Sequence, residues 1–401
     1  MTTQARPVGN GLLALAGLLS LAAAMGLGRF AFTPVLPLML QEGRLDIAQG
    51  GWLAAANYAG YLAGALTASR VPLRAGTLGV VALMATAALT AAMALPLPGL
   101  WLPLRFLAGA ASAWVFVATS VWCLGALAQG GGMRASGWVY AGVGIGIALA
   151  GTYCLLAASA GVRSQPLWLQ LGAMVLVLAL PVAWVVARLR PGAEVAASTG
   201  AGTLARVDAS STRGLVVCYG CMGFGYILPA TFLPVLARGV VDDPRLFGLA
   251  WPLFGATAAL STLLAARLLQ GSNRMRGWAG CQLLMGVGVL LPACWTNAWT
   301  IAASALLVGG TFMVITLVGV QEMRARAATS GEAAARVGHI TAAFALGQIA
   351  GPVVAAILLR FGPDGLTLAL GTGAAALFAT SAWLWRSSRP VLVVKELLNG
   401  G

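Results

Sequence analysis

Long apolar segments and short polar segments alternate along the chain from one end to the other. The apolar runs reach about 20 residues, the length that an α-helix needs to cross a bilayer core roughly 30 Å thick. Backbone groups in lipid must be paired within a helix or a closed barrel, and the chain lacks the short alternating segments of barrel strands. The pattern predicts an all-α polytopic membrane protein with twelve spans, at residues 11–39, 50–69, 75–96, 100–127, 136–160, 166–188, 214–237, 246–269, 277–296, 299–323, 337–360 and 364–386.

Composition supports the membrane prediction and fixes an orientation. Hydrophobic residues make up 60% of the chain and charged residues 8%, whereas a soluble domain is about one quarter charged. The net charge of +14 is dispersed over short gaps between apolar runs, which argues against a nucleic-acid partner. With the N-terminus in the cytoplasm, seventeen of the 24 basic residues fall in cytoplasmic segments and five in outer loops. The positive-inside rule therefore predicts that both termini are cytoplasmic.

The longest polar segment divides the chain into two halves. It is rich in Gly, Ala, Ser and Thr and lacks helical periodicity, so we predict a flexible cytoplasmic linker. The predicted organisation is a six-helix N-terminal half, the linker, and a six-helix C-terminal half with a short cytoplasmic tail, at residues 1–189, 190–213 and 214–401.

The two halves resemble each other in sequence. Gly26-Leu27-Gly28 is followed by Pro37, and Gly223-Phe224-Gly225 is followed by Pro234 at the same interval. Gly146 in the fifth span similarly corresponds to Gly347 in the eleventh. Two six-helix halves in parallel repeat are the architecture of one large class of transporters.

Several motifs resemble those of the major facilitator superfamily. The fourth span begins with RFLAGAASA, similar to R-x-x-x-G, and the eleventh carries GQIAGP, similar to a motif that normally lies in the fifth. The segment GALTASRVPLR keeps the glycine and the basic Arg70 and Arg74 of the loop motif between spans two and three, but Ala68 stands in place of its aspartate. That departure puts in doubt the gating salt bridge usually assigned to this loop.

The segments GRFAFTPVLPLM and GWLAAANYAGYLAGAL more specifically resemble the YbfB/YjiJ-type branch of the superfamily, a bacterial group. The resemblance covers essentially the whole chain. It implies the major facilitator fold and a multi-pass location in the bacterial inner membrane. We expect the protein to be a monomer.

Arg29 is the most informative single residue, because it lies deep in the first apolar span. An arginine near mid-membrane costs at least about 2.5 kcal/mol on insertion scales, so it should face protein or water. Three interpretations remain open: a residue facing the transport cavity, an arginine that snorkels to the outer surface, and a buried ion pair. Arg105 lies closer to the start of its span, and two interpretations of it are open: an anchor at the membrane interface or a residue that faces the cavity.

The acidic residues show an opposite distribution. All ten fall in loops, tails or span ends, so the predicted cavity has fixed positive charge and no fixed negative charge. A guanidinium binds carboxylate or phosphate groups with two hydrogen bonds, which favours an anionic or zwitterionic substrate.

Other polar or aromatic residues within spans are candidates for the cavity wall, with interhelical packing as the alternative for each. Asn57 and Tyr61 share one helix face. Tyr226, Trp114 and Gln348 complete the set of candidates. For gating or coupling we consider Arg70, Arg74, Glu322 and His339; the histidine either relays protons or simply lies at the membrane interface.

Cys218 and Cys221 form a C-x-x-C inside an apolar run, with no histidine nearby in sequence. They predict helix packing rather than a metal site. We expect no metal ion, no cofactor and no enzymatic activity, since acid, base and nucleophile candidates do not converge at membrane depth.

These observations predict a secondary active transporter of the major facilitator type that moves a small organic solute by alternating access. An efflux antiporter for neutral or cationic drugs or metabolites is the alternative, and a channel, a sensor or an intramembrane enzyme are distant ones. The expected partners are the small-molecule substrate, the lipid bilayer and a coupled proton or other ion.

Overall fold

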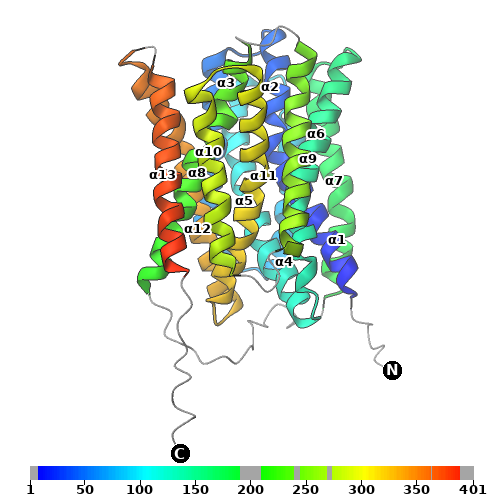
Figure 1. The fold of residues 1–401 in the computed structure, drawn as a ribbon. Coiled ribbons are helices and arrows are strands. Elements are labelled where there is room, and N and C mark those ends of the chain that lie inside the picture. The colour runs from blue at the N-terminus through cyan, green and yellow to red at the C-terminus, as the bar shows by residue number, and fades with distance from the viewer. Residues whose placement is uncertain (1–7, 190–208, 239–243, 269–272, 363, 389–401) are drawn as a thin grey trace, which may run out of the picture.

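The computed structural model describes residues 8–189, 209–238, 244–268, 273–362 and 364–388, and these residues form a bundle of long, roughly parallel helices (Figure 1). The first span consists of three joined segments, α1 (Asn10–Leu21), the π-helix η1 (Ala22–Phe30) and α2 (Phe32–Gln41). Pro34 has no N–H to donate to the carbonyl of Phe30, so the α-helical hydrogen-bond pattern is interrupted where η1 ends. Arg29 lies in this π-helical segment, a geometry that often occurs at functional sites.

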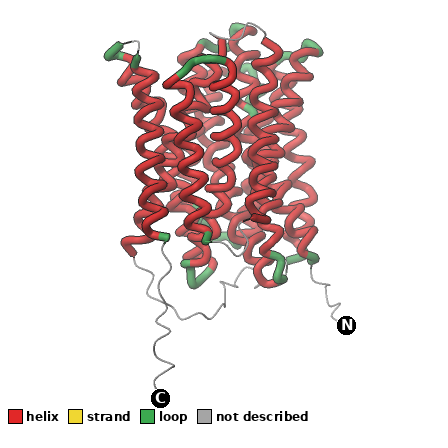
Figure 2. The backbone as a smooth tube through the Cα atoms, in the orientation of Figure 1, coloured by secondary structure: helices red, strands yellow, loops and turns green. Residues whose placement is uncertain are grey.

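The other helices follow in an up-and-down order, with short loops at both ends of the bundle (Figure 2). They are α3 (Ile47–Thr67), α4 (Ala75–Ala92), α5 (Pro98–Gln129), the short 3₁₀ turn η2 (Met133–Ala135), α6 (Ser136–Ser159), α7 (Ser164–Ala187), α8 (Ala209–Arg238), α9 (Pro244–Leu268), α10 (Arg274–Cys294), α11 (Ala298–Ala325), α12 (Ser330–Leu359) and α13 (Gly365–Ser387).

The fold is that of a polytopic helical membrane protein, as predicted. Within the described residues, ten helical segments are long and apolar enough to cross a membrane, and α3 and α9 are not among them. Both nevertheless pack against helices that are, since Gly64 of α3 meets the backbone of Ala110 in α5 and Gly255 of α9 meets that of Ala148 in α6. The helix order is therefore compatible with the twelve predicted spans.

Two boundaries differ from the sequence-based expectation. Helix α8 begins at Ala209, so the predicted linker 190–213 overlaps it, and residues 190–208 lie outside the described part of the chain. Helix α12 begins at Ser330 rather than near residue 337, because the Thr329 hydroxyl accepts the amide of Glu332 at its N-terminus. His339 consequently lies inside this helix and not at its start.

The start of α1 and the end of α13 lie at the same end of the bundle, called the terminal end below (Figure 1). This placement is compatible with two termini on one side of the membrane. Their location in the cytoplasm stays a prediction.

The helices before and after the linker meet most closely along α6 and α9. A Cβ added to Gly144 would lie 2.4 Å from the backbone nitrogen of Ala259, and one added to Gly255 would lie 2.3 Å from that of Ala148. Such distances exclude any side chain, so small residues let the two backbones touch. Helix α3 packs against α12 in the same way, with Gly338 against the carbonyl of Ala65.

The internal repeat is visible in the packing. Gly146 packs against the carbonyl of Ala22 in the first span, and Gly347 packs against the carbonyl of Gly220 in α8. The corresponding glycines therefore make corresponding contacts, each holding a fifth or eleventh helix against the helix that carries the candidate site residues.

Candidate functional site

Arg29 is the centre of a buried polar cluster. Its side chain is only 2% exposed. The Nε atom donates to Oδ1 of Asn57 at 3.3 Å, and Nη2 donates to Oε1 of Gln348 at 2.5 Å. Because Asn57 lies on α3 and Gln348 on α12, the cluster joins the two halves of the bundle near mid-height.

Aromatic rings surround the same guanidinium. Its Cζ atom lies 3.7 Å from the ring centroid of Tyr61, 5.2 Å from that of Phe30 and 5.8 Å from that of Tyr58. A cation over an aromatic face is attracted by the ring quadrupole, and more strongly where water is excluded. The rings therefore supply part of the stabilisation that water would give an exposed arginine.

Two nitrogen atoms of this cluster have no acceptor among the residues that the structure describes. They are Nη1 of Arg29 and Nε2 of Gln348, both buried. The amide of Asn57 has partners at both atoms, since its Oδ1 accepts from Arg29 and its Nδ2 donates to the backbone carbonyl of Arg105 at 3.0 Å. A buried unpaired donor usually marks a missing partner or a functional role.

Arg105 is buried as well, with 3% of its surface exposed. Its guanidinium lies 4.5 Å from the ring centroid of Phe32, and its Nε has no acceptor. It does not reach the surface as an interface anchor would. It contributes a second fixed positive charge to the N-terminal half, beside the Arg29 cluster and linked to it through Asn57.

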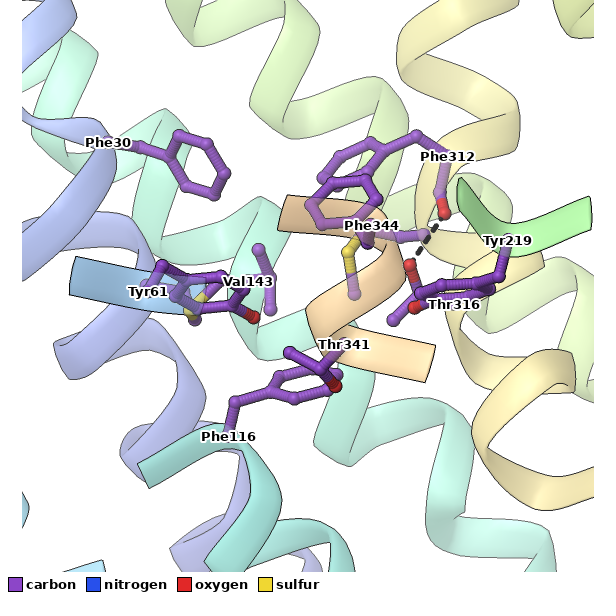
Figure 3. A pocket seen from close by; sticks show the side chains of 11 residues that line it. Phe30, Tyr61, Phe116, Val143, Tyr219, Phe312, Thr316, Thr341 and Phe344 are labelled. Atoms are coloured by element: carbon purple, nitrogen blue, oxygen red, sulfur yellow. Dashed lines mark hydrogen bonds between the residues drawn. The ribbon is translucent and has the colours of Figure 1, made fainter. Parts of the chain in front are cut away.

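A small cavity lies between the halves, next to the rings that contact Arg29. Its volume of about 20 Å³ is enough for roughly one water molecule. Figure 3 shows Phe30 and Tyr61 on one side of it and Phe312, Tyr219 and Thr316 on the other. The complete lining is Met25, Phe30, Tyr61, Phe116, Val143, Tyr219, Phe312, Met313, Thr316, Thr341 and Phe344.

Tyr226 belongs to an aromatic cluster behind this lining, not to the cavity wall. Its ring stacks on Phe312 with centroids 4.9 Å apart, and it packs obliquely against Phe254 and Phe344. Phe254 in turn stacks on Trp251 at 5.4 Å. The C-terminal half thus presents stacked rings where the N-terminal half presents charge.

The remaining predicted residues lie away from the cluster. Trp114 donates to the hydroxyl of Thr67 at 3.0 Å. Arg70 and Arg74 are exposed near the terminal end, and His339 is exposed on α12. Glu322 forms an ion pair with Arg326 at 2.9 Å, one helical turn away on the same segment. None of these placements brings a gating or coupling candidate to Arg29.

Among the described residues, the acidic side chains lie only at the two ends of the bundle. Glu42, Asp46 and Asp364 adjoin helix ends opposite the terminal end, while Glu322 and Glu332 lie near the terminal end. Arg29 and Arg105 are the charged residues that are buried in this part of the chain. The buried centre therefore has positive charge without a neighbouring carboxylate.

Sequence reasoning missed a polar contact between the halves. Arg324, which the sequence places with the cytoplasmic residues, lies within α11 and donates to the backbone carbonyls of Ser120 and Val121 on α5. Gln321 donates to the hydroxyl of Ser136 nearby, at 2.8 Å. These contacts hold the halves together toward the terminal end. The only available signal was that Arg324 lies just past the apolar run of the tenth span, after Gln321 and Glu322.

Comparison with solved structures shows the fold. The human organic anion transporter MFSD10 (TETRAN) aligns with a TM-score of 0.69 and 18% identity, covering 96% of this chain and all of that one. FucP, a major facilitator transporter solved in the outward conformation, aligns with a TM-score of 0.67 and 16% identity, covering 92% of this chain and 98% of that one. The E. coli fucose:proton symporter FucP aligns in a further structure with a TM-score of 0.61 and 15% identity, at the same coverage. No curated protein matches the sequence.

The family model described as the uncharacterised MFS-type transporter YbfB matches residues 21–384, nearly the whole chain. That range includes the buried arginine cluster, the aromatic cavity and both halves of the bundle. The chain belongs to the YbfB-type family of major facilitator superfamily transporters.

Proposed function

We propose that this transporter carries small organic anions across the membrane by alternating access, through a site formed by Arg29 and Gln348 between its two halves. Family and fold make it a secondary transporter. The family resemblance supports a bacterial inner-membrane location. A neighbour in fold is named as an organic anion transporter, which agrees with the proposal although the identity is low.

The observation that carries the proposal is the set of unpaired donors. Nη1 of Arg29 and Nε2 of Gln348 belong to the two groups that share this hydrogen bond, and neither nitrogen has an acceptor among the described residues. The two oxygens of a carboxylate would accept from both at once. Such an anion would also neutralise the Arg29 charge, which no described carboxylate does.

The cavity next to this cluster indicates what the rest of the substrate is like. Its walls are mainly aromatic and apolar, with two methionines, which adapt readily to different shapes. Small-molecule sites combine such walls with a few polar groups that fix orientation. The arrangement favours an anion with an apolar body, for example an aromatic carboxylate, over a small hydrophilic ion.

The aromatic walls also favour a second candidate, the efflux of neutral or cationic amphiphiles. Aromatic faces attract cations. The two buried arginines oppose a cationic substrate, because like charges in a site with little water repel strongly. The organic anion is therefore the better supported candidate.

Ligand-dependent stability of purified protein tests the proposal. The probes are benzoate, succinate, inorganic phosphate, L-fucose and choline, each with the wild type and with Arg29→Met. A ligand at 100 times its dissociation constant stabilises a protein by about 2.7 kcal/mol, which a thermal melt detects. We expect benzoate to raise the melting temperature of the wild type and to leave that of Arg29→Met unchanged.

The matched control removes a different arginine. Arg188 lies at the end of α7 with its guanidinium 3.4 Å from the ring of Trp184, away from the site, so Arg188→Met should retain the benzoate response. Arg29→Met removes an unneutralised buried charge but leaves the oxygens of Asn57 and Gln348 without this donor, so the response to benzoate is compared with the melting temperature of the same variant without ligand. Stabilisation by choline or fucose that does not depend on Arg29 would contradict the proposal.

A further inference from the structure

The hydrogen bond from Arg29 to Gln348 joins the two halves, whereas the bond from Arg29 to Asn57 lies within one half. Asn57 lies in the same half as Arg29, on α3, and therefore accompanies it whatever the arrangement of the halves. Gln348 lies on α12 in the opposite half. Its carbonyl oxygen is available to Arg29 only while the halves are closed around the site.

Closing the two halves around the site is electrostatically unfavourable at Arg29. A secondary transporter passes through a closed state each time the site changes sides, and closure removes water from the guanidinium. A substrate anion compensates that loss when the site is loaded. When the site is empty, the described part of the chain offers no carboxylate, and a buried charge with too few acceptors is strongly unfavourable.

Gln348 is placed to supply the missing acceptor. Its side chain is fully buried, and its Oε1 lies 2.5 Å from Nη2 of Arg29. A neutral amide oxygen cannot cancel the charge, but it is a good acceptor and stays in the protein. It gives the guanidinium one acceptor in the empty site, while Nη1 has none among the described residues until an anion binds.

We propose that Gln348 replaces the substrate's carboxylate when the site is empty, so that the unloaded transporter closes and returns across the membrane. The protein then performs net transport. Without this acceptor, only the loaded form closes readily, and the protein becomes an exchanger that moves one anion against another. The transport mode rests on the proposed anion specificity, whereas the closure of the empty protein does not.

The first test measures closure in purified protein without any added anion. Hydrogen exchange is followed by mass spectrometry in nanodiscs, in peptides that cover Ala22–Phe30 and residues 341–352. A hydrogen bond to a charged group contributes enough that its loss should favour opening by about ten-fold or more. We expect Gln348→Leu to exchange faster in both segments, and Gln348→Glu, which keeps the size and adds a carboxylate, to exchange more slowly than the wild type.

Gln282→Leu is the matched control. Gln282 is also fully buried, but it accepts from Trp278 on its own helix and donates to Cys218 on α8 and Thr380 on α13. All of these partners lie within the C-terminal half, so exchange in Ala22–Phe30 should stay at the wild-type rate. Equal exchange in the wild type and Gln348→Leu, or equal acceleration of Ala22–Phe30 by Gln282→Leu, would overturn the inference.

The second test separates net transport from exchange, with radiolabelled benzoate as the probe. Net uptake is measured into empty proteoliposomes, and exchange into vesicles preloaded with benzoate. Because Gln348 also belongs to the proposed anion site, both rates are measured at saturating benzoate, and we expect the ratio of net uptake to exchange to fall about ten-fold or more in Gln348→Leu. Parallel losses in both assays would contradict the proposed role. If the wild type moves no anion in either assay, the proposed function fails, and the hydrogen-exchange result alone decides the role of Gln348.

Discussion

The two halves of this transporter share an architecture but place different chemistry at corresponding positions. At the interval of 197 residues that relates Gly26 to Gly223, Arg29 corresponds to Tyr226, and Asn57 corresponds to Phe254. In the N-terminal half these positions form a hydrogen-bonded charge, and in the C-terminal half they form packed aromatic rings. The repeat therefore preserves the backbone, while these positions carry a charge in one half and aromatic rings in the other.

This difference gives each half a distinct task in binding an anion with an apolar body. The N-terminal half holds the charge that attracts the carboxylate, and the C-terminal half contributes the rings of Phe312 and Phe344 to the cavity. Gln348 is the exception, a polar side chain that the C-terminal half directs at Arg29. Because the site is complete only when both halves contribute, binding is linked to their closure.

Moving the charge into the aromatic half should produce the largest effect. Tyr226→Arg places a guanidinium among Phe254, Phe312 and Phe344, where no acceptor is described, and an uncompensated buried charge costs about 3–5 kcal/mol. We expect a large loss of folded protein in thermal melts and in size-exclusion chromatography. Tyr226→Phe keeps the ring and should melt near the wild-type temperature. A stable Tyr226→Arg protein would show that the halves are less different than their side chains indicate.

A subtler comparison converts one buried amide to an acid in each half. Asn57→Asp puts a carboxylate beside Nε of Arg29, where a charge-assisted hydrogen bond replaces a neutral one, so the melting temperature should rise. The new carboxylate also repels a substrate anion, and we expect benzoate affinity to fall about ten-fold or more in a binding titration.

Gln282→Glu is the counterpart in the C-terminal half. Its neighbours there are Trp278, Cys218 and Thr380, with no cation among them, so the acid is buried without compensation and the melting temperature should fall. A rise in melting temperature for Asn57→Asp together with a fall for Gln282→Glu would support the contrast between the halves. Equal destabilisation by both would contradict it.

The sequence predicted much of the fold and several of the residues that the structure brings together. The spans follow from the apolar runs. Polar groups within such runs are costly in lipid, so the sequence also singles out four residues as candidates, namely Arg29, Asn57, Tyr61 and Gln348. Their roles in binding stay predictions. The contact between Arg29 and Gln348 was not predictable, since it joins residues 319 positions apart and depends on how α12 packs against the first span.

Other features had no distinct sequence signal. Phe312 and Phe344 line the cavity, but a phenylalanine in an apolar span looks the same whether it faces a cavity, a neighbouring helix or lipid. Tyr226 was expected at the cavity wall and instead packs behind it, because Phe312 takes the nearer position. The π-helix that carries Arg29 is also not evident from hydrophobic periodicity, which barely distinguishes it from an α-helix over nine residues.

The smallest predicted effect concerns a titratable contact of the N-terminal half, far from its central charge. Glu42 accepts hydrogen bonds from the backbone amide and the hydroxyl of Ser164, the first residue of α7, and lies 3.4 Å from Nε of Arg44. A carboxylate at a helix N-terminus is favoured by the exposed N–H groups and the helix dipole. Burial raises the pKa of Glu42, but the bonds from Ser164 and the charge and hydrogen bond of Arg44 outweigh it, so the pKa lies below its ordinary value of 4.5.

A lowered pKa in the folded state means that Glu42 stabilises the protein above its unfolded pKa and that this contribution is lost as the pH falls through the folded value. We expect the melting temperature of the wild type to drop by a few degrees more than that of Glu42→Gln between pH 7 and pH 3.5, measured in the same detergent. Glu42→Gln should still respond to benzoate at pH 7, because the site at Arg29 is untouched. Identical pH profiles for the two proteins would show that the Glu42 contact adds nothing to stability, and that the polar chemistry of the N-terminal half matters only at its centre.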